Sequence, residues 1–361
     1  MEIKAFKFHK IYTIEIEGVF MAKLIGIDVG FGFVKVTDGD AGYSFPSVVG
    51  EGHTKSTFST KASQLLLDDL RIDIGKGLNF VGKAAIKHSR FVFRDLSSTR
   101  STGDDFEILF FSALSLFCDN SMNEFKVVTG LPVERMHLYD DLVKRVRGMR
   151  SITVFRNGKP VNININVTDV EIVPQPLGTY WSQSLIFTGQ GTSLQQEGRT
   201  GVIDIGFRTS DLAAIEDFEY IPQKSKSVNV GLSTAYSDIS ADLINEFGLE
   251  KESYALDGIV IKRSINVAGQ IFDISRIVDR AFEKLATNIL VEINSLWRIQ
   301  DFDILLLSGG GGQAVSRHLL IQLPQAKLVP DPITANCLGY LAWVNRLWGA
   351  TVENKAFSDE T

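Results

Sequence analysis

The sequence predicts an α/β protein of two domains, and three observations support this. The chain has 361 residues, which is enough for two hydrophobic cores. Strand-like and helix-like apolar patterns alternate along most of it. A strand–turn–strand unit occurs twice, at residues 24–36 and 202–215, and the first strand of each ends in Asp-x-Gly. One such unit is common punctuation, but two matching copies are far less expected by chance.

Both hairpins combine features of a phosphate site that also holds a cation. Glycine lets backbone N–H groups come close to a ligand, and successive N–H groups form an anion-binding concavity. Carboxylates beside it would repel a bare phosphate, so they imply a bridging Mg²⁺. The residues concerned are Asp28, Gly30, Gly32 and Lys35 in the first copy, then Asp204, Gly206, Thr209 and Asp211 in the second.

The composition is that of a globular chain, with 44% hydrophobic residues, 22% charged residues and a net charge of −6. A broad electrostatic surface for DNA is not expected at this charge, so we expect no direct DNA binding. The cysteines, Cys118 and Cys337, match no disulfide framework or zinc site. This usage favours a reducing cytoplasm.

No membrane span or leader is expected. The most apolar run, 108–117, is about half of the ~20 residues that cross a bilayer. Glu15 and Glu17 interrupt the apolar part of the N-terminus, which argues against a signal peptide. Met21 directly precedes the first hairpin, so residues 1–20 are either an N-terminal extension or lie before the natural start.

The first half of the chain continues the first hairpin as a meander. Asp38-Gly39-Asp40 is a turn signal, and a third strand is expected over residues 43–49. Residues 50–95 are polar and irregular, and are expected to form a small subdomain inserted at a sheet edge. The elements expected next are a buried helix over 104–118, a buried strand over 125–129 and a helix over 139–147.

The middle of the chain holds the best candidate domain boundary. Residues 152–173 alternate between apolar and polar, with a hairpin signal at Asn157-Gly158, and run into Pro174-Gln175-Pro176. Residues 189–200, rich in Gly, Gln, Ser and Thr, are expected to be a loop. The other elements expected are a helix over 179–187, two strands in 218–230, a helix over 274–297 and a strand over 304–307. Between them, Gly231-Leu232-Ser233-Thr234 precedes a helix that runs through Phe247, with Ser233 or Thr234 as the possible N-cap.

Four consecutive glycines, Gly309, Gly310, Gly311 and Gly312, follow that strand and precede a helix expected over 314–320. A flexible loop would explain them. Their place between a strand and a helix instead favours close approach of a phosphate or nucleoside to the backbone. A last helix is expected over 333–348, and the polar tail 352–361 is expected to fray.

The ordered set of motifs resembles the actin-like ATPase superfamily, which includes sugar kinases and the heat-shock chaperone ATPases. Within it, the chain is most similar to the bacterial actin-like proteins of plasmid segregation, the ParM/StbA type. The segments that carry the resemblance are Gly26-Ile27-Asp28-Val29-Gly30-Phe31-Gly32 with Lys35, Phe45-Pro46-Ser47-Val48-Val49, Val81-Gly82-Lys83-Ala84-Ala85, Val128-Thr129-Gly130-Leu131-Pro132-Val133, and Pro330-Asp331-Pro332 to Ala335-Asn336 with Gly339. The Phe-Pro-Ser and Gly-Leu-Pro-Val pieces are the more specific to the subfamily.

The resemblance implies an actin-like fold of two lobes, each a ribonuclease-H-like domain, that close over a nucleotide. It assigns residues 21–188 with 332–361 to the first lobe and 189–331 to the second. By the same resemblance, the hairpins hold the phosphates of ATP, with GTP as the alternative. Mg²⁺ would be positioned by Asp28 and Asp204 through its waters.

The resemblance also assigns roles to individual residues. Gln175 lies where the family orients the attacking water, and a glutamine can only orient water because it is a poor base. The catalytic candidates are Gln175, Asp204, Asp28 and Asp211. The nucleotide-binding candidates are Gly30, Phe31, Gly32, Lys35, Gly206, Phe207, Arg208, Thr209, Gly231, Gly309, Gly310, Gly311 and Gly312.

Both hairpins depart from the family pattern. Phe31 stands where actin has a serine, and Phe207 and Arg208 follow Gly206 where a second glycine is common. Phe207 is expected to crowd the backbone, and Arg208 either contacts phosphate or faces solvent. Backbone contacts to phosphate survive both changes, whereas side-chain contacts do not carry over.

The function implied is a nucleotide-gated filament of head-to-tail subunits, for plasmid segregation or other cytoskeletal positioning. An adaptor protein would link it to DNA or other cargo. A small-molecule kinase is one alternative, with Asp204 or Asp211 as its base, although no sugar-site signature is visible. A non-polymerising ATPase scaffold is the other. Light scattering after ATP is added separates a filament former from both.

Overall fold

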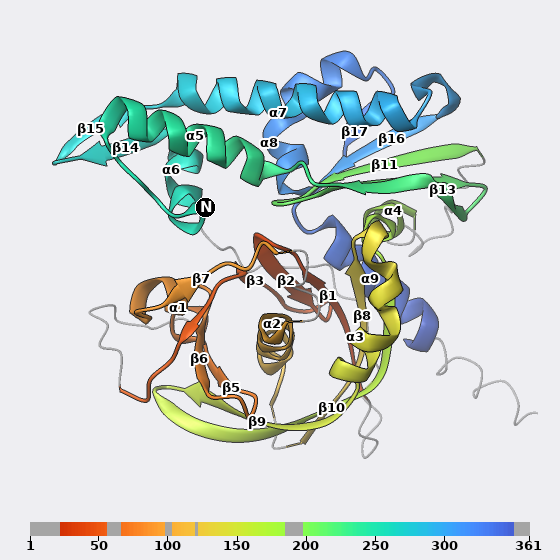
Figure 1. Cartoon of the computed structure of the whole chain (residues 1–361). Helices are drawn as coiled ribbons and strands as arrows, with labels where there is room; N and C mark the ends of the chain where they lie inside the picture. The colour runs from red at the N-terminus through yellow and green to blue at the C-terminus, as the bar shows by residue number, and fades with distance from the viewer. Residues whose placement is uncertain (1–21, 56–65, 98–102, 120–121, 185–197, 350–361) are drawn as a thin grey trace, which may run out of the picture. The chain divides into compact units, whose positions relative to one another are not determined.

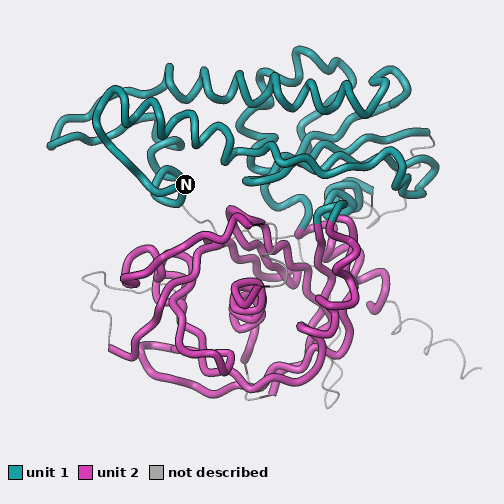
Figure 2. Tube along the Cα trace, in the orientation of Figure 1, with its two compact units in different colours: residues 1–3, 132–134, 175–336 teal, residues 4–131, 135–174, 337–361 magenta. Residues whose placement is uncertain are grey.

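The computed structural model describes residues 22–55, 66–97, 103–119, 122–184 and 198–349. These residues form two compact units (Figure 2). Unit 1 holds 132–134 and 175–336, and unit 2 holds the other described residues. The expected extension 1–20, the expected lobe boundary at 188 and 189, and the tail 352–361 lie outside the described residues.

Unit 2 is built on a ten-stranded mixed sheet in the order β3-β2-β1-β8-β10-β9-β5-β6-β4-β7. Its strands are β1 (Lys23–Val29), β2 (Phe33–Thr37), β3 (Gly42–Pro46), β4 (Val49–Glu51), β5 (Arg71–Asp73), β6 (Leu78–Val81), β7 (Val92–Phe93), β8 (Met122–Leu131), β9 (Gly148–Arg156) and β10 (Lys159–Pro174). The pairs β1–β8 and β8–β10 are parallel, and the remaining pairs are antiparallel.

This sheet curves around helix α2 (Asp104–Ser115), as Figure 1 shows. Apart from its first two residues, the whole helix is buried, which confirms the buried helix expected here. A helix that is apolar on all sides is stable only inside a core. The other helical elements of this unit are α1 (Lys83–His88), α3 (Tyr139–Val146), most of α9 (Ala335–Val344), most of η3 (Val133–Leu138), η1 (Leu66–Asp69) and the π-turn η6 (Asn345–Gly349).

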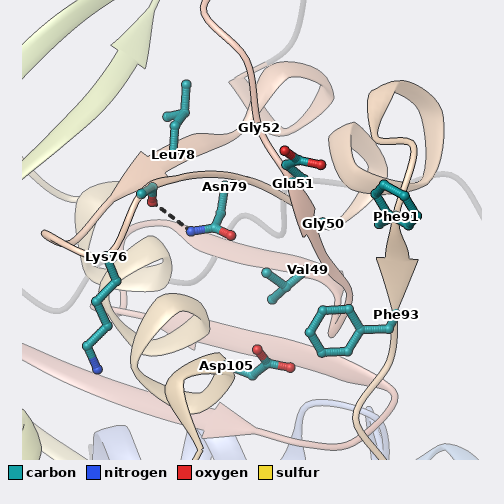
Figure 3. A pocket seen from close by; sticks show the side chains of 11 residues that line it. Val49, Gly50, Glu51, Gly52, Lys76, Leu78, Asn79, Phe91, Phe93 and Asp105 are labelled. Atoms are coloured by element: carbon teal, nitrogen blue, oxygen red, sulfur yellow. Dashed lines mark hydrogen bonds between the residues drawn. The ribbon is translucent and has the colours of Figure 1, made fainter.

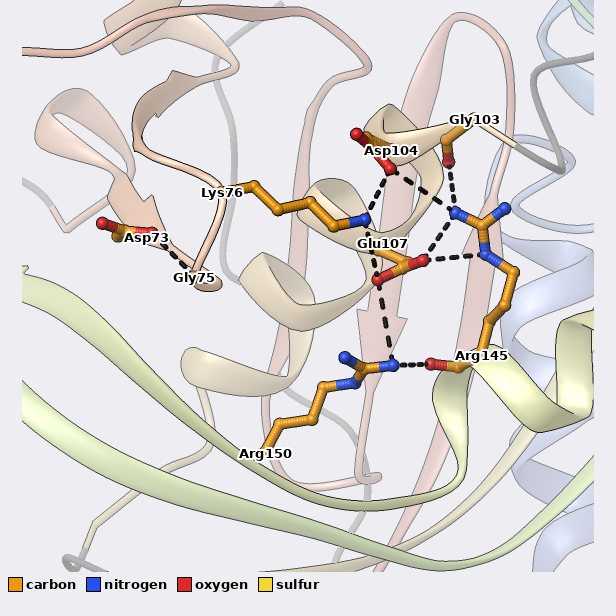
Figure 4. Close-up of polar contacts among 8 residues, drawn as sticks. All are labelled: Asp73, Gly75, Lys76, Gly103, Asp104, Glu107, Arg145 and Arg150. Atoms are coloured by element: carbon orange, nitrogen blue, oxygen red, sulfur yellow. Dashed lines mark hydrogen bonds and ion pairs between the residues drawn. The ribbon is translucent and has the colours of Figure 1, made fainter.

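Glu107 places a buried carboxylate in the first turns of α2, and cations from three other segments surround it (Figure 4). Arg145 from α3 donates its Nε to Glu107 Oε1 at 2.8 Å. Lys76 Nζ and an Arg150 nitrogen lie 3.7 and 3.9 Å from Oε2. Removing one partner of a buried ion pair leaves an uncompensated charge, so this cluster fixes α2 against α3, β9 and the β5–β6 loop.

The described residues of 50–95 are more regular than expected, because β4 to β7 extend the main sheet at its edge. Arg71, at the start of β5, is fully buried. Its guanidinium donates to both Asp69 carboxylate oxygens and to the carbonyls of His53 and Lys55. It also lies over the rings of Phe80 and Phe155. These bonds satisfy a buried charge and order segments whose sequence looks polar and irregular.

Unit 1 holds a five-stranded sheet in the order β13-β12-β11-β16-β17 and a separate hairpin, β14–β15. Its strands are β11 (Arg199–Ile205), β12 (Ser210–Glu216), β13 (Glu219–Val228), β14 (Ser264–Val267), β15 (Gln270–Asp273), β16 (Ile304–Ser308) and β17 (Ala326–Leu328). Its helices are α4 (Pro176–Ser184), α5 (Leu232–Phe247), α6 (Ser253–Lys262), α7 (Ser275–Leu296) and α8 (Gly309–Gln322), with the 3₁₀ turn η5 (Ile299–Asp301). Helix α4 packs on one face of the sheet, opposite α7 and α8 in Figure 1.

Several features of unit 1 differ from the expectations. Residues 219–228 form one strand instead of two, because β13 is an edge strand that tolerates Pro222 and a register shift against β12. Helix α6 and the hairpin β14–β15 were not expected. The long helix expected over 274–297 is confirmed as α7. None of the helices in the described residues is both long and apolar enough to cross a membrane.

Helix α9 crosses β1 at Gly26 in backbone-to-backbone contact. A Cβ at Gly26 would lie 2.5 Å from the Cys337 carbonyl oxygen and 2.6 Å from the Leu341 nitrogen. The Cys337 thiol donates back to the Gly26 carbonyl at 3.3 Å. Only glycine permits this approach.

We therefore expect Gly26→Ala to destabilise the protein by about 3 kcal/mol, because neither backbone can move without disturbing a whole element. Gly258→Ala is the matched control. A Cβ at Gly258, in α6, meets no atom within 4 Å, so this change should stabilise by about 0.5–1 kcal/mol. Urea unfolding measures both. Equal midpoints for the two variants would contradict the close crossing.

Candidate functional site

The first hairpin joins β1 to β2 through a turn at residues 30–32. Asp28 and Lys35 are opposite one another in the strand register. Lys35 Nζ donates to Asp28 Oδ2 at 2.9 Å, and both side chains are largely buried. A Cβ at Gly30 would lie 2.9 Å from the Phe33 carbonyl and 3.3 Å from Lys35 Nζ. The turn thus brings a cation, a carboxylate and bare backbone together, as the sequence predicts.

Ser47 holds this turn in place. Its hydroxyl donates to the Gly30 carbonyl at 2.6 Å, and its N–H donates to the Gly32 carbonyl at 2.9 Å. Ser47 is buried and follows directly on β3. The serine of the Phe-Pro-Ser motif therefore fixes the turn, because it donates hydrogen bonds to two of the turn's carbonyl groups.

The second hairpin joins β11 to β12, and Asp204 and Asp211 are paired directly opposite one another. Both carboxylates are buried. They share a sheet face with Val202, which packs with Tyr180 of α4. Like charges directly opposite one another destabilise a sheet, so each carboxylate needs partners of its own.

Asp204 belongs to a buried polar network. Asn336 Nδ2 donates to Asp204 Oδ2 at 2.7 Å, and Asn336 Oδ1 accepts the Thr179 N–H at 2.9 Å. Thr179 Oγ1 lies 2.7 Å from Asn336 Oδ1 and 2.8 Å from Ser308 Oγ. The network ties the ends of β11 and β16 to α4 and to the start of α9.

Gln175 stands at the start of the helix that this network holds. It lies between Pro174, the last residue of β10, and Pro176, the first of α4. Its carbonyl accepts the Gly178 N–H at 3.1 Å. Because Thr179 lies one turn further along α4, the network that binds Asp204 also fixes the backbone of Gln175.

Asp211 has a different set of partners. Its Oδ1 accepts the Val133 N–H at 3.1 Å and a short hydrogen bond from the Ser227 hydroxyl, while Thr209 Oγ1 lies 3.4 Å from Oδ2. Ser227 Oγ also accepts the Glu134 N–H at 3.3 Å. Asp211 thus holds the segment 132–134 against the sheet of unit 1.

The turn of the second hairpin supports the start of α5. Within the turn, the Gly206 N–H donates to the Thr209 carbonyl at 2.9 Å. The N–H groups of Leu232 and Ser233 donate to the carbonyls of Gly206 and Phe207. The N-cap is Gly231, not Ser233 or Thr234, because the turn carbonyls take the first helical donors. A Cβ at Gly231 would lie 2.8 Å from the Phe207 carbonyl oxygen.

Phe207 was expected to crowd the backbone, but it does not. Its ring packs edge-on against Tyr236 of α5, with centroids 5.3 Å apart, and is buried. Arg208 is half-buried.

The four glycines form the first turn of α8 and do not form a loop before a helix at 314. Gly309 has a φ of +82°, and a Cβ there would lie 2.3 Å from the Ile205 carbonyl and 2.5 Å from Asp204 Oδ1. A Cβ at Gly311 would lie 2.4 Å from Ile205 Cγ2. The close approach that the glycines predict is therefore made in part by the second hairpin itself. Gly310 is more open, with its nearest atom at 3.8 Å.

Five polar residues of these arrangements were absent from the predicted site. Asn336 and Ser47 lie in motifs that carry the family resemblance, and this was the available signal. Thr179, Ser308 and Ser227 have no local signal, because their partners are far away in sequence. The five residues are Ser47, Thr179, Ser227, Ser308 and Asn336.

Two family models match the two halves of the chain. Residues 26–178 match the N-terminal domain of actin-like proteins, and residues 202–320 match the C-terminal domain of the archaeal MreB-like actin homologue. Archaeal actin homologues of Thermoplasma volcanium and Thermoplasma acidophilum are each 26% identical over 233 residues, which is 62% of this chain and 68% of theirs.

Solved actin-like structures share the fold. The ParM of a 15-stranded filament from Clostridium botulinum superposes with a TM-score of 0.75 at 23% identity, covering 90% of this chain and all of that one. Ta0583, an archaeal actin homologue solved with ADP, gives 0.73 at 21% identity with the same coverage. Together, the two family models show that the chain is an actin-like protein, and these structures show that it shares the fold of ParM and of the archaeal actin homologue Ta0583.

Proposed function

We propose that this protein binds ATP with Mg²⁺, hydrolyses it and assembles into nucleotide-gated filaments. The observation that carries the proposal is the duplicated hairpin, in which a strand-end carboxylate stands beside a glycine turn in each unit. Solved relatives support it, because Ta0583 and a Bacillus thuringiensis ParM contain ADP and the Clostridium botulinum ParM forms a filament. The cargo would be plasmid DNA or another body, reached through an adaptor.

In this proposal, each hairpin contributes groups that bind phosphate. Lys35 supplies a positive charge, and the glycine turns supply backbone N–H groups. Asp28 and Asp204 offer hard oxygen donors of the kind that Mg²⁺ takes through its waters. The metal, when bound, offsets the phosphate charge. Gln175, fixed between two prolines at the start of α4, orients the attacking water.

The partners of Asp211 bear on the kinase alternative. A general base must be able to reach the substrate proton. The Asp211 oxygens already hold Val133, Ser227 and Thr209. We therefore assign Asp211 a positioning role. Asp204 is then the carboxylate that would have to act as the general base if the protein were a kinase.

The described part of the segment 50–95 is the proposed site of one end of the head-to-tail contact. A pocket there is lined by Phe91 and Phe93 and by three charged residues, Glu51, Lys76 and Asp105 of α2 (Figure 3). The two rings are 71% and 50% exposed, which is costly for a surface that stays in water. A head-to-tail contact is heterologous and does not close, so it would propagate a filament.

The first test of this function concerns Asp204. Asp204→Asn keeps the volume and an oxygen for Asn336 but removes the charge that Mg²⁺ requires. We expect ATP turnover to fall about a hundredfold or more, while the thermal midpoint changes little. Asp211→Asn, the matched change across the strand pair, should lower turnover far less. Unchanged turnover of Asp204→Asn over a Mg²⁺ titration would remove Asp204 from the site.

Gln175→Ala should bind ATP normally and hydrolyse it roughly tenfold to a hundredfold more slowly, because the attacking water loses its orientation. Filaments formed with ATP should then last longer than those of the wild type. Binding is measured with a fluorescent ATP analogue, and turnover by phosphate release. If turnover and filament lifetime both stay at wild-type values, Gln175 has a structural role only.

Assembly is tested by sedimentation with ATP, with ADP and without nucleotide. We expect the pellet to depend on ATP, and Phe91→Ser/Phe93→Ser to raise the protein concentration needed for assembly at least about tenfold. Met149→Ser is the matched control, because Met149 is 62% exposed on β9 and does not line the pocket. Equal sedimentation under all three conditions would contradict nucleotide gating and favour the kinase or scaffold alternative.

A further inference from the structure

A cation from another segment lies at the tip of the first hairpin, and no sequence motif indicated it. The guanidinium carbon of Arg135 lies over the Phe31 ring, 5.1 Å from its centroid. Phe31 stands between Gly30 and Gly32, and both side chains are half-buried. A guanidinium prefers the face of an aromatic ring when it is partly desolvated, so Phe31 provides a seat for Arg135 at the turn.

Hydrogen bonds fix the turn that carries Phe31 and the segment that precedes Arg135. The Phe31 turn is fixed by Ser47, which takes the carbonyls of Gly30 and Gly32. The chain leading to Arg135 is fixed in unit 1, where Asp211 accepts the Val133 N–H and Ser227 accepts the Glu134 N–H. Arg135 follows Glu134 directly, at the point where the chain passes from unit 1 into unit 2.

The charges of the other groups at the turn bear on the role of the Arg135 guanidinium. Lys35 also lies at the turn, where it shares its charge with Asp28 at 2.9 Å. A triphosphate brings several negative charges to the turn. Arginine is suited to binding these charges, since its planar guanidinium donates two parallel hydrogen bonds to phosphate oxygens.

We propose that Arg135, seated on Phe31, binds the terminal phosphate of the nucleotide. This inference rests on the proposed function and adds a specificity: the residue distinguishes a nucleoside triphosphate from a diphosphate. It also gives a role to Phe31, which stands where actin has a serine. The aromatic residue acts through the arginine it holds.

The test is a set of binding titrations on the full chain with ATP, ADP and adenosine, each with Mg²⁺. We expect Arg135→Gln to weaken ATP binding by about tenfold to a hundredfold, ADP binding by less, and adenosine binding not at all. Arg135→Lys should recover part of the loss, because it restores charge without the fork. Phe31→Leu should weaken ATP binding several-fold, because the charge stays but its seat is lost.

Arg346→Gln is the matched control, because Arg346 also lies over an aromatic ring, that of Trp343, at 5.6 Å. It should leave all three affinities unchanged. Equal affinity of Arg135→Gln and wild type for ATP would overturn the inference while the proposed function stands. An equal loss for ATP, ADP and adenosine would also overturn it, since it would show a structural role. A wild-type chain that binds none of the three would remove the proposed function, and this inference with it.

Discussion

The structure of unit 1 depends on a carboxylate that is almost fully buried. Asp204 is buried directly opposite Asp211, and their repulsion is tolerated only because separate donors hold them. Asn336 binds Asp204 and, through Thr179, the first turn of α4. The same hydrogen bonds that satisfy a costly buried charge therefore align two strands with two helices. A residue proposed for metal chemistry is thus also a fold determinant, which is why the Asn substitution is more informative than Ala.

Unit 2 handles buried charge in the same way, with Glu107 among three cations and Arg71 among carbonyls and rings. These sites are not near the hairpins in sequence, and their bonds order the segments around them. Their presence shows that a buried ion pair in this protein is weak evidence of function. What distinguishes the hairpins is the combination of a strand-end carboxylate with a glycine turn.

Local signals predicted both hairpins, the buried helix α2 and the long helix α7, because each has its periodicity or turn chemistry written in adjacent residues. The helix start at Gly309 was missed because glycine disfavours a helix, and the contact with Ile205 that requires it is long-range. Asn336 lies 132 residues from Asp204, so no window of sequence could pair them. The hairpin β14–β15 was missed because its turn is Ala268-Gly269, without the Asn-Gly or Asp-Gly signal.

The two cysteines have a practical consequence. Burial raises the pKa of the Cys118 thiol to about 12 and that of the Cys337 thiol further still. Since the thiolate is the reactive form, a maleimide added at neutral pH should modify neither residue while unit 2 stays folded. Cys337 contacts the strand that carries Asp28, and Cys118 follows α2. The natural sequence therefore contains two internal reporters of local opening in unit 2, and no engineered label is needed to follow it.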